Sequence, residues 1–317
     1  MAIFITFFLL VLGLALLVKG SDIFVDAASG LARNFKVSNL TIGLTVMAFG
    51  TSAPEAFIGI RSAIDGTTAL AMGNVIGSDI FNLIFIIGFA AIITPMAINF
   101  KTIARDYFVA IFSPILLLVM MLIFDAEIPK LGAAVLLILF FIYVLAVVRE
   151  VLKNRNEHFE IEKELNAFIQ PLKRNIFFTI LGLICILIGG EIAVYNAVVV
   201  AELLGMSPRI IGLSIVAIGT SLPELMIVIT AARRGESELA VGNIIGSSIF
   251  NIMFVLGLTG LIAPLPIEVG LIYDLVFLLG ASAVFCIFCL MRKKLTRLEG
   301  FVMIGMYVGY LASVILG

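Results

Sequence analysis

Histidine, cysteine, tryptophan and charged residues are scarce in this sequence. Among 317 residues there are one histidine, three cysteines and no tryptophan, and charged residues make up only 13%. The single histidine, His158, lies in a polar segment, and we assign it no catalytic role. Cys185, Cys286 and Cys289 lie in apolar runs, so we interpret them as packing residues rather than redox or metal-binding thiols. The net charge of −1 gives no reason to expect a nucleic-acid partner.

Apolar residues dominate instead and make up 62% of the chain, far more than in a soluble domain. They form long runs at residues 1–18, 39–60, 67–100, 107–124, 131–148, 175–200, 207–232, 238–266, 270–291 and 299–316. Most runs approach the ~20 residues that an α-helix needs to cross the hydrocarbon core of a bilayer. A membrane β-barrel would alternate polar and apolar residues, and these runs do not. The sequence therefore predicts an all-α integral membrane protein with ten transmembrane helices.

Two motifs occur twice in the chain, at a constant separation of 169 residues. The first copy reads GTSAPE at 50–55 and GNVIGSDIFN at 73–82. The second copy reads GTSLPE at 219–224 and GNIIGSSIFN at 242–251. A duplicated set of polar residues, one in each half, suggests a single site built where two repeats meet.

The two halves are predicted to have opposite orientations in the membrane. Each half carries five predicted helices, and because five is odd, the second half must insert the other way round. With the N-terminus outside, 17 of the 20 Lys and Arg residues fall in cytoplasmic segments, which favours placing both termini outside the cytoplasm. The sequence therefore predicts inverted five-helix repeats at 1–148 and 175–317, with motif regions 43–82 and 212–251, joined by a cytoplasmic linker at 149–174.

Each repeat places oxygen-bearing side chains inside apolar sequence, where ionisable groups are costly and usually functional. On a helix, Thr51, Ser52 and Glu55 would share one face. Pro54 has no N–H, so the helix should break there and leave the Gly50 carbonyl oxygen free to face a polar cavity. The second copy repeats this arrangement. The pooled candidate cation ligands are Gly50, Thr51, Ser52, Glu55, Ser78, Asp79, Asn82, Gly219, Thr220, Ser221, Glu224, Ser247 and Asn251.

All of these groups are hard oxygen donors, and the set contains no His, Cys or Met, which disfavours zinc, copper and iron. Calcium accepts six to eight oxygens in flexible geometry, whereas magnesium prefers a tight octahedron. Two glutamates supply two negative charges, which one Ca²⁺ or several monovalent ions can neutralise in turn. Glycine-rich Ser/Thr/Asn motifs also serve helix packing, but a Glu after a helix-breaking Pro in both copies favours ion binding.

At these motifs the chain resembles the cation/calcium exchanger superfamily, and especially its short prokaryotic sodium/calcium antiporters. The repeats of that family carry G-T-S-x-P-E and G-N-x-x-G-S-x-x-x-N/D. The resemblance implies that Glu55 and Glu224 are the central Ca²⁺ ligands and also face Na⁺, and that the hydroxyls and amides complete the Ca²⁺ site and flanking Na⁺ sites. It also implies alternating access by sliding of the first and sixth helices. We expect no enzymatic activity and no cofactor other than the transported Ca²⁺ and Na⁺.

Two positions depart from the family pattern. Asn251 stands where some sodium/calcium members have Asp, and Asn at both copies also occurs in proton/calcium members. Asp79 is an additional acid where the second repeat has Ser248, and we expect it to add a third charge to the site or to bind a cytoplasm-side partner group.

Three other functions remain open from the sequence. A proton/calcium antiporter could use the same site. A passive cation channel is disfavoured by the inverted repeat. An intramembrane enzyme is disfavoured because the sequence shows no nucleophile–base pair. Asp22, Asp26 and Glu191 near the ends of the first and sixth helices are interpreted as interfacial charges, with gating of an ion path as the alternative. The protein is expected to work as a monomer in the plasma (inner) membrane.

Overall fold

The computed structural model describes residues 2–124, 126–154, 170–205, 217–292 and 294–316. The first half contains α1 (Ala2–Phe35), α2 (Asn39–Ile42), η1 (Gly43–Met47), α3 (Ala48–Thr51), α4 (Ala53–Ile64), α5 (Thr68–Ile80), η2 (Phe81–Ile86), α6 (Ile87–Ile93), β1 (Met96–Ala97), α7 (Phe100–Ile123), β2 (Glu127–Ile128) and α8 (Lys130–Asn154). The second half contains α10 (Leu172–Leu203), α12 (Ala217–Gly219), α13 (Leu222–Arg233), α14 (Ser237–Ile249), η4 (Phe250–Val255), α15 (Leu256–Ile262), β3 (Leu265–Pro266), α16 (Val269–Arg292), β4 (Lys294–Leu295) and α17 (Arg297–Leu316). The elements labelled η are π-helical turns.

The repeat seen in the sequence is present in the helix boundaries. Helices α4, α5, α6 and α7 recur as α13, α14, α15 and α16, with both ends of each helix displaced by 169 residues. The π-helical turn η2 recurs as η4 at the same separation. Strand β1 of the first half pairs with β4 of the second, and β3 of the second pairs with β2 of the first. The two short ribbons therefore each join one half of the chain to the other.

Seven helical stretches in the described part of the chain are long and apolar enough to cross a membrane. They are Phe4–Phe35, Thr68–Ile93, Phe100–Ile123, Lys130–Lys153, Leu172–Leu203, Ser237–Ile262 and Val269–Met291. The predicted run 39–60 is divided among α2, η1, α3 and α4, and the run 207–232 lies partly outside the described residues. An all-α membrane architecture is thus confirmed, and the count of ten transmembrane helices stays a prediction.

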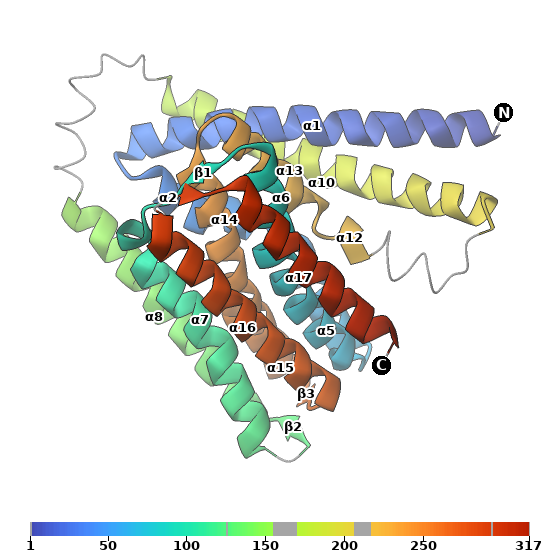
Figure 1. The fold of residues 1–317 in the computed structure, drawn as a ribbon, viewed down its shortest axis with the longest axis vertical. Helices are drawn as coiled ribbons and strands as arrows, with labels where there is room; N and C mark the ends of the chain where they lie inside the picture. The colour runs from blue at the N-terminus through green and yellow to red at the C-terminus, as the bar shows by residue number, and fades with distance from the viewer. Residues whose placement is uncertain (1, 125, 155–169, 206–216, 293, 317) are drawn as a thin grey trace.

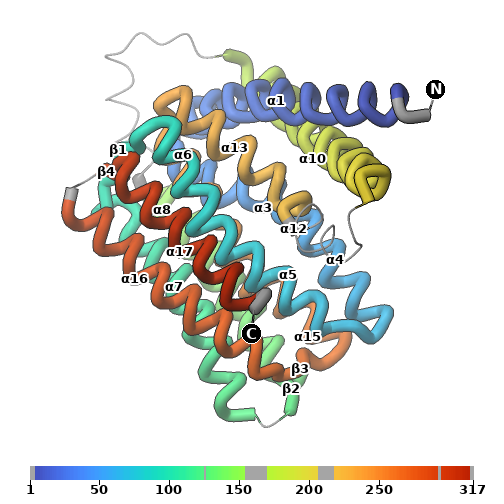
Figure 2. The backbone as a smooth tube through the Cα atoms, turned by 45° about the vertical axis from the view of Figure 1, so that its right-hand side comes forward, coloured from blue at the N-terminus to red at the C-terminus, as the bar shows by residue number. Residues whose placement is uncertain are grey.

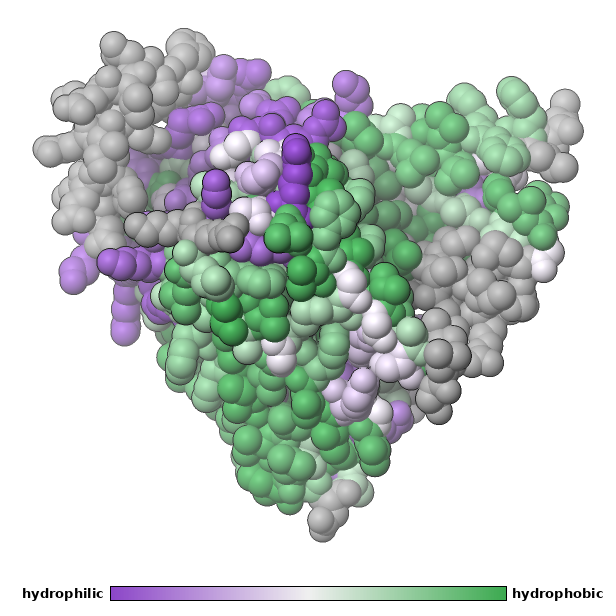
Figure 3. Space-filling view, in the orientation of Figure 1, coloured by the Kyte–Doolittle hydropathy of each residue, from purple (hydrophilic) through white to green (hydrophobic). Residues whose placement is uncertain are grey.

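Two of these stretches form the interior of the molecule. The most apolar windows of Thr68–Ile93 and Ser237–Ile262 are 72% and 78% buried, whereas those of the other five are 22–39% buried. Apolar side chains cover the lower part of the visible surface, and polar ones gather at the upper end near β1 (Figure 3). The interior stretches carry the second motif of each repeat, so these motifs are shielded from lipid by the surrounding helices.

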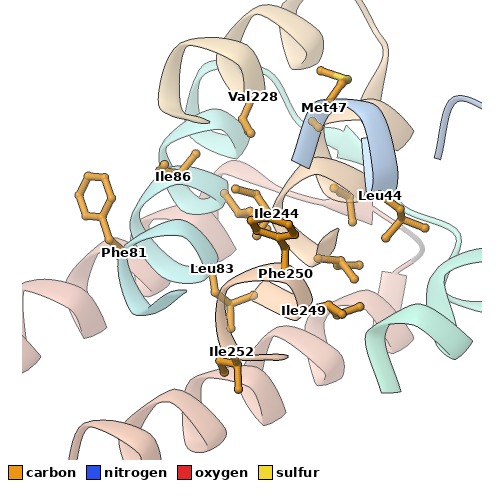
Figure 4. Packing of buried hydrophobic residues seen from close by; sticks show 14 of the residues in the cluster. Leu44, Met47, Phe81, Leu83, Ile86, Val228, Ile244, Ile249, Phe250 and Ile252 are labelled. Carbon is orange, nitrogen blue, oxygen red and sulfur yellow. The ribbon is translucent and has the colours of Figure 1, made fainter. Parts of the chain in front are cut away.

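Apolar side chains from both halves pack around the second motifs. Figure 4 shows the cluster, which includes Leu44, Met47, Phe81, Leu83, Ile86, Val228, Ile244, Ile249, Phe250 and Ile252. Ile244 and Ile252 are fully buried, as are Met47 and Ile86 from the first half. This packing fixes α14 and η4 against η1 and η2.

Helices α1 and α10 lie side by side and antiparallel at one edge of the molecule (Figures 1 and 2). Their contact is made by glycines: a Cβ added to Gly13, Gly20, Gly182 or Gly189 would lie only 2.6–2.9 Å from backbone nitrogen atoms of the facing helix. Small residues of this kind allow two membrane helices to approach backbone to backbone. The two long helices therefore form a closely packed pair beside the rest of the bundle.

At one end, polar contacts tie this pair to the core. The Ser21 and Thr230 hydroxyls are hydrogen-bonded at 2.9 Å in a buried position between α1 and α13. Arg234, just beyond α13, pairs with Asp22 at 3.4 Å and with Asp26 at 3.3 Å. These pairs, half-exposed at Asp22 and exposed at Asp26, link α1 to α13.

The described residues of the other half form no equivalent contact. The position equivalent to Asp22 is Glu191 on α10, and no described residue forms an ion pair with it. The position equivalent to Arg234 is Asp65, which pairs instead with Arg61 of its own helix at 2.7 Å. The two ends of the molecule thus differ in how the α1–α10 pair is held.

Candidate cation-binding site

Both GTSxPE motifs break their helices, as the prolines predict. Helix α3 ends at Thr51, Ser52 has φ −84° and ψ 8°, and α4 begins at the next residue with Pro54 in its first turn. In the second copy, Ser221 has φ −96° and ψ 8°, and α13 begins immediately after it. Proline fits the first turn of a helix because the N–H that it lacks would have no partner there.

The breaks place Glu55 and Glu224 in the first turns of α4 and α13. Backbone N–H groups at a helix N-terminus favour negative charge, so each carboxylate lies at the end of a helix that stabilises it. Both side chains are 0% exposed, and their four carboxylate oxygens have no hydrogen-bond partner among the described residues. The two glutamates, from opposite halves, are close enough to interact electrostatically. Two buried acids without a cationic partner form a site that is suited to bind cations.

Hydroxyl and amide groups from both halves surround the glutamates. Thr51, Ser52, Ser78, Asn82, Ser221, Ser247 and Asn251 are all buried. Of these, Ser52, Ser221 and Ser247 have hydroxyls without a hydrogen-bond partner in the described ranges, and neither end of the Asn82 amide has one there. Thr220 is half-buried. The sequence-predicted side chains are therefore mostly buried, and several of their oxygen atoms accept no hydrogen bond from a described residue.

The two glycines of the GTS motifs lie against α10. A Cβ added to Gly50 would be 3.0 Å from Leu183, and one added to Gly219 would be 2.5 Å from Val194. The breaks in both halves are therefore in direct contact with the same outer helix. This contact provides a route by which α10 and the backbone at the site can affect each other.

The second motifs adopt a backbone that the sequence did not reveal. Asn82 lies in the π-helical turn η2 and Asn251 in the π-helical turn η4. A π-turn widens the helix by one residue per turn and is frequent at functional sites. Helical spacing alone would treat Ser78 and Asn82 as neighbours on a regular α-helix, so this spacing carries no signal for the change.

Asp79 joins the two halves directly. Its Oδ1 accepts a hydrogen bond from Nδ2 of Asn251 at 3.1 Å, and the side chain is 0% exposed. Asp79 also interacts electrostatically with Glu55 and lies beside Ser248, its counterpart in the second repeat. The partner expected from the sequence was a group on the cytoplasmic side, whereas Asn251 belongs to the second motif, and the sequence could not indicate this contact. A contribution of Asp79 to the charge of the ion site stays a prediction.

Sequence reasoning omitted Asn243, which follows the first glycine of the second GN motif. Asn243 is 0% exposed, its Oδ1 accepts a hydrogen bond from the Thr51 hydroxyl at 3.4 Å, and its Nδ2 has no partner. Its counterpart Asn74 also has a buried Nδ2 without a partner. The only signal in the sequence was the recurrence of this asparagine in both copies of the motif.

Comparisons with known proteins identify the family of this chain. The family model described as "Sodium/calcium exchanger protein" matches residues 5–149 and 174–316. Sodium/calcium exchanger MaX1 of Methanosarcina acetivorans is 35% identical, covering 97% of this chain and 97% of its own length. Inner membrane protein YrbG of Escherichia coli is 34% identical, covering 96% of this chain and 95% of its own.

A solved structure of the sodium-calcium exchanger NCX_Mj is similar to the whole fold. It has a TM-score of 0.82 and 33% sequence identity, and the alignment covers 98% of each chain. The family match covers both motif-bearing halves and leaves out the polar segment between them. This multi-pass membrane protein therefore belongs to the sodium/calcium exchanger family, which is a family of transporters and not of enzymes.

Proposed function

We propose that the protein is a secondary active antiporter that exchanges Ca²⁺ for Na⁺ across the membrane by alternating access. The observation that carries this proposal is the pair Glu55 and Glu224, fully buried and from opposite repeats, whose four carboxylate oxygens have no hydrogen-bond partner within the part of the chain that the structure describes. Their two charges match one Ca²⁺, and carboxylate, hydroxyl, amide and carbonyl oxygens are the ligands that calcium prefers. The family relationship supports both the cargo and the exchange reaction.

The ligand set proposed for the transported ions comes from both repeats. Glu55 and Glu224 hold Ca²⁺, and the same carboxylates bind Na⁺ when Ca²⁺ has left. The remaining oxygens come from Gly50, Thr51, Ser52, Ser78, Asn82, Gly219, Thr220, Ser221, Ser247 and Asn251. Because Na⁺ and Ca²⁺ share central ligands, binding of one excludes the other, which is the requirement for coupled exchange.

Access to the site is proposed to alternate by movement of the α1–α10 pair over the core. The glycine contacts unite α1 and α10, and Gly50 and Gly219 lie directly against α10. A shift of the pair therefore changes the surroundings of both helix breaks together. We also propose that the protein is a monomer in the inner membrane with both termini outside the cytoplasm.

The proposal is tested by ⁴⁵Ca²⁺ uptake into proteoliposomes. Vesicles loaded with Na⁺ are diluted into Na⁺-free buffer, and a parallel set carries a pH gradient and no Na⁺. Uptake driven by internal Na⁺ is expected, and it should be absent from protein-free vesicles. Uptake that follows only the pH gradient would assign the protein to proton/calcium exchange. Calcium conductance that needs no counter-ion would instead identify a channel.

A further inference from the structure

The hydrogen bond between Asp79 and Asn251 breaks the symmetry of the site. Asp79 and Ser248 occupy equivalent positions in the two repeats, as do Asn82 and Asn251. A symmetric site would pair residue 79 with 251 and residue 248 with 82. Only the first contact is made, at 3.1 Å, and the Asn82 amide has no hydrogen-bond partner. The two asparagines are therefore held differently although their motifs match.

The chemistry of this contact fixes which way the Asn251 amide points. An ionised carboxylate only accepts hydrogen bonds, whereas an amide has a donating –NH₂ and an accepting carbonyl oxygen. In the structure the –NH₂ of Asn251 donates to Asp79 Oδ1, and Oδ1 of Asn251 is turned away from that carboxyl group. Asn251 is 1% exposed, and its Oδ1 is buried without a partner. Without Asp79 this hydrogen bond is lost, and the Asn251 amide is free to turn so that its –NH₂ faces the cation.

Asp79 interacts electrostatically with both Glu55 and Glu224. It borders a cavity of about 20 Å³ between the core and the outer helices α7 and α16. Most of the cavity wall is apolar and includes Leu83, Ile111 and Leu278. The one tyrosine in this wall, Tyr107, donates its hydroxyl to the Ser282 carbonyl oxygen. The cavity thus offers few ligands for an ion of its own.

We propose that Asp79 is a positioning residue that orients Asn251 so that its carbonyl oxygen faces the transported cation. The inference rests on the proposed function, since it assigns a role at the same site. Asp79 acts through the hydrogen bond that its Oδ1 accepts, and Asn251 is the ligand. A role as a direct third carboxylate ligand is the alternative that the experiment must separate.

The decisive comparison is between Asp79→Asn and Asp79→Ala. The asparagine side chain keeps a carbonyl oxygen that accepts from Asn251, whereas alanine has none. Equilibrium ⁴⁵Ca²⁺ binding to detergent-solubilised protein should therefore change little in Asp79→Asn and weaken by roughly tenfold in Asp79→Ala. In proteoliposomes the same loss should appear in KM for Ca²⁺ more than in the maximal rate.

A double-mutant cycle shows whether Asp79 acts through Asn251. Asn251→Ala removes the ligand, so adding Asp79→Ala to it should weaken binding no further. Additive losses would overturn the proposal. Equal loss in Asp79→Asn and Asp79→Ala would also overturn it, because it would assign the effect to the charge. Unchanged binding in both would show that Asp79 has no role.

Swapping the two residues, so that Asn stands at 79 and Asp at 251, keeps the test independent of how well the alanine variant folds. Asn251→Asp alone places two carboxylates at hydrogen-bond distance and should weaken binding or folding. Adding Asp79→Asn restores a donor and an acceptor in reversed order, and Ca²⁺ binding should recover. Failure to recover would contradict the positioning role. Glu55→Gln measured in parallel tests the site itself: if that variant binds Ca²⁺ normally, the proposed function fails whatever Asp79 does.

Discussion

Replacing Glu55 with glutamine is the sharpest test of the site because it removes one of its two central charges and little else. Glutamine has nearly the same size and keeps a carbonyl oxygen. Breaking one side of a buried charge pair costs about 3–5 kcal/mol. Affinity for Ca²⁺ should therefore fall by roughly 100- to 4,000-fold, since ~1.4 kcal/mol corresponds to a factor of ten.

The same substitution should have the opposite effect on the ion-free protein. Glu55 is 0% exposed and its carboxylate oxygens have no hydrogen-bond partner, so the charge is costly when no cation is bound. Glu55→Gln should raise the unfolding temperature in Ca²⁺-free buffer. A loss of affinity combined with a gain of stability is expected of a ligand and not of a packing residue.

Thermal unfolding with and without Ca²⁺ measures both effects. At Ca²⁺ a hundredfold above Kd, the wild-type protein should gain about 2.7 kcal/mol of stability. At the same concentration a variant with a hundredfold weaker site should gain at most about 0.4 kcal/mol. Glu191→Gln, the same change at an exposed position on α10, is the matched control and should behave like the wild type. A Glu55→Gln variant that Ca²⁺ stabilises as strongly as the wild type would refute the assignment.

Three further changes test other parts of the structure. Thr51→Ala removes one neutral group next to Asn243, so Ca²⁺ affinity should fall by only about three- to tenfold in equilibrium binding. Gly182→Ala puts a Cβ 2.7 Å from the α1 backbone, and overpacking should destabilise the protein by about 1–3 kcal/mol and slow exchange. Gly280→Ala, where an added Cβ meets nothing within 4 Å, should leave thermal stability and exchange rate unchanged. Arg234→Gln removes two partly exposed pairs worth about 0.2–1 kcal/mol each and should speed hydrogen exchange where α1 meets α13. Arg61→Gln, which removes a pair within one helix, should not have that effect, and equal hydrogen exchange in the two arginine variants would contradict the proposed tie.

The sequence predicted the helix breaks well because proline acts locally. Pro54 and Pro223 lack the N–H of a helix interior and each follows a break, at Ser52 and Ser221. Pro114 lies inside α7 without ending that helix, so proline alone does not decide where a helix breaks. Burial of Glu55 and Glu224 was likewise foreseeable, since their motifs lie inside apolar runs.

Contacts between the two halves could not be predicted in the same way. The hydrogen bond from Asn251 to Asp79 spans 172 residues of sequence, and no periodicity indicates it. The π-helical turns at Asn82 and Asn251 depend on packing within the core, so helical spacing missed them. The predicted span 39–60 was treated as one helix, whereas the chain there consists of several short pieces. The linker around His158 lies outside the described residues.

The different contacts at the two ends of the α1–α10 pair bear on the relative populations of the two open states that the proposed mechanism requires. In a perfectly symmetric inverted repeat, the states open to either side would have equal energy and equal population. Arg234 links α13 to α1 at one end, whereas the equivalent residue in the first half is Asp65, which pairs with Arg61. Under the proposed mechanism we therefore expect the resting population to be biased toward one open state, and the apparent affinities measured from the two sides of the membrane to differ. The bias cannot set the direction of net transport, which depends only on the ion gradients.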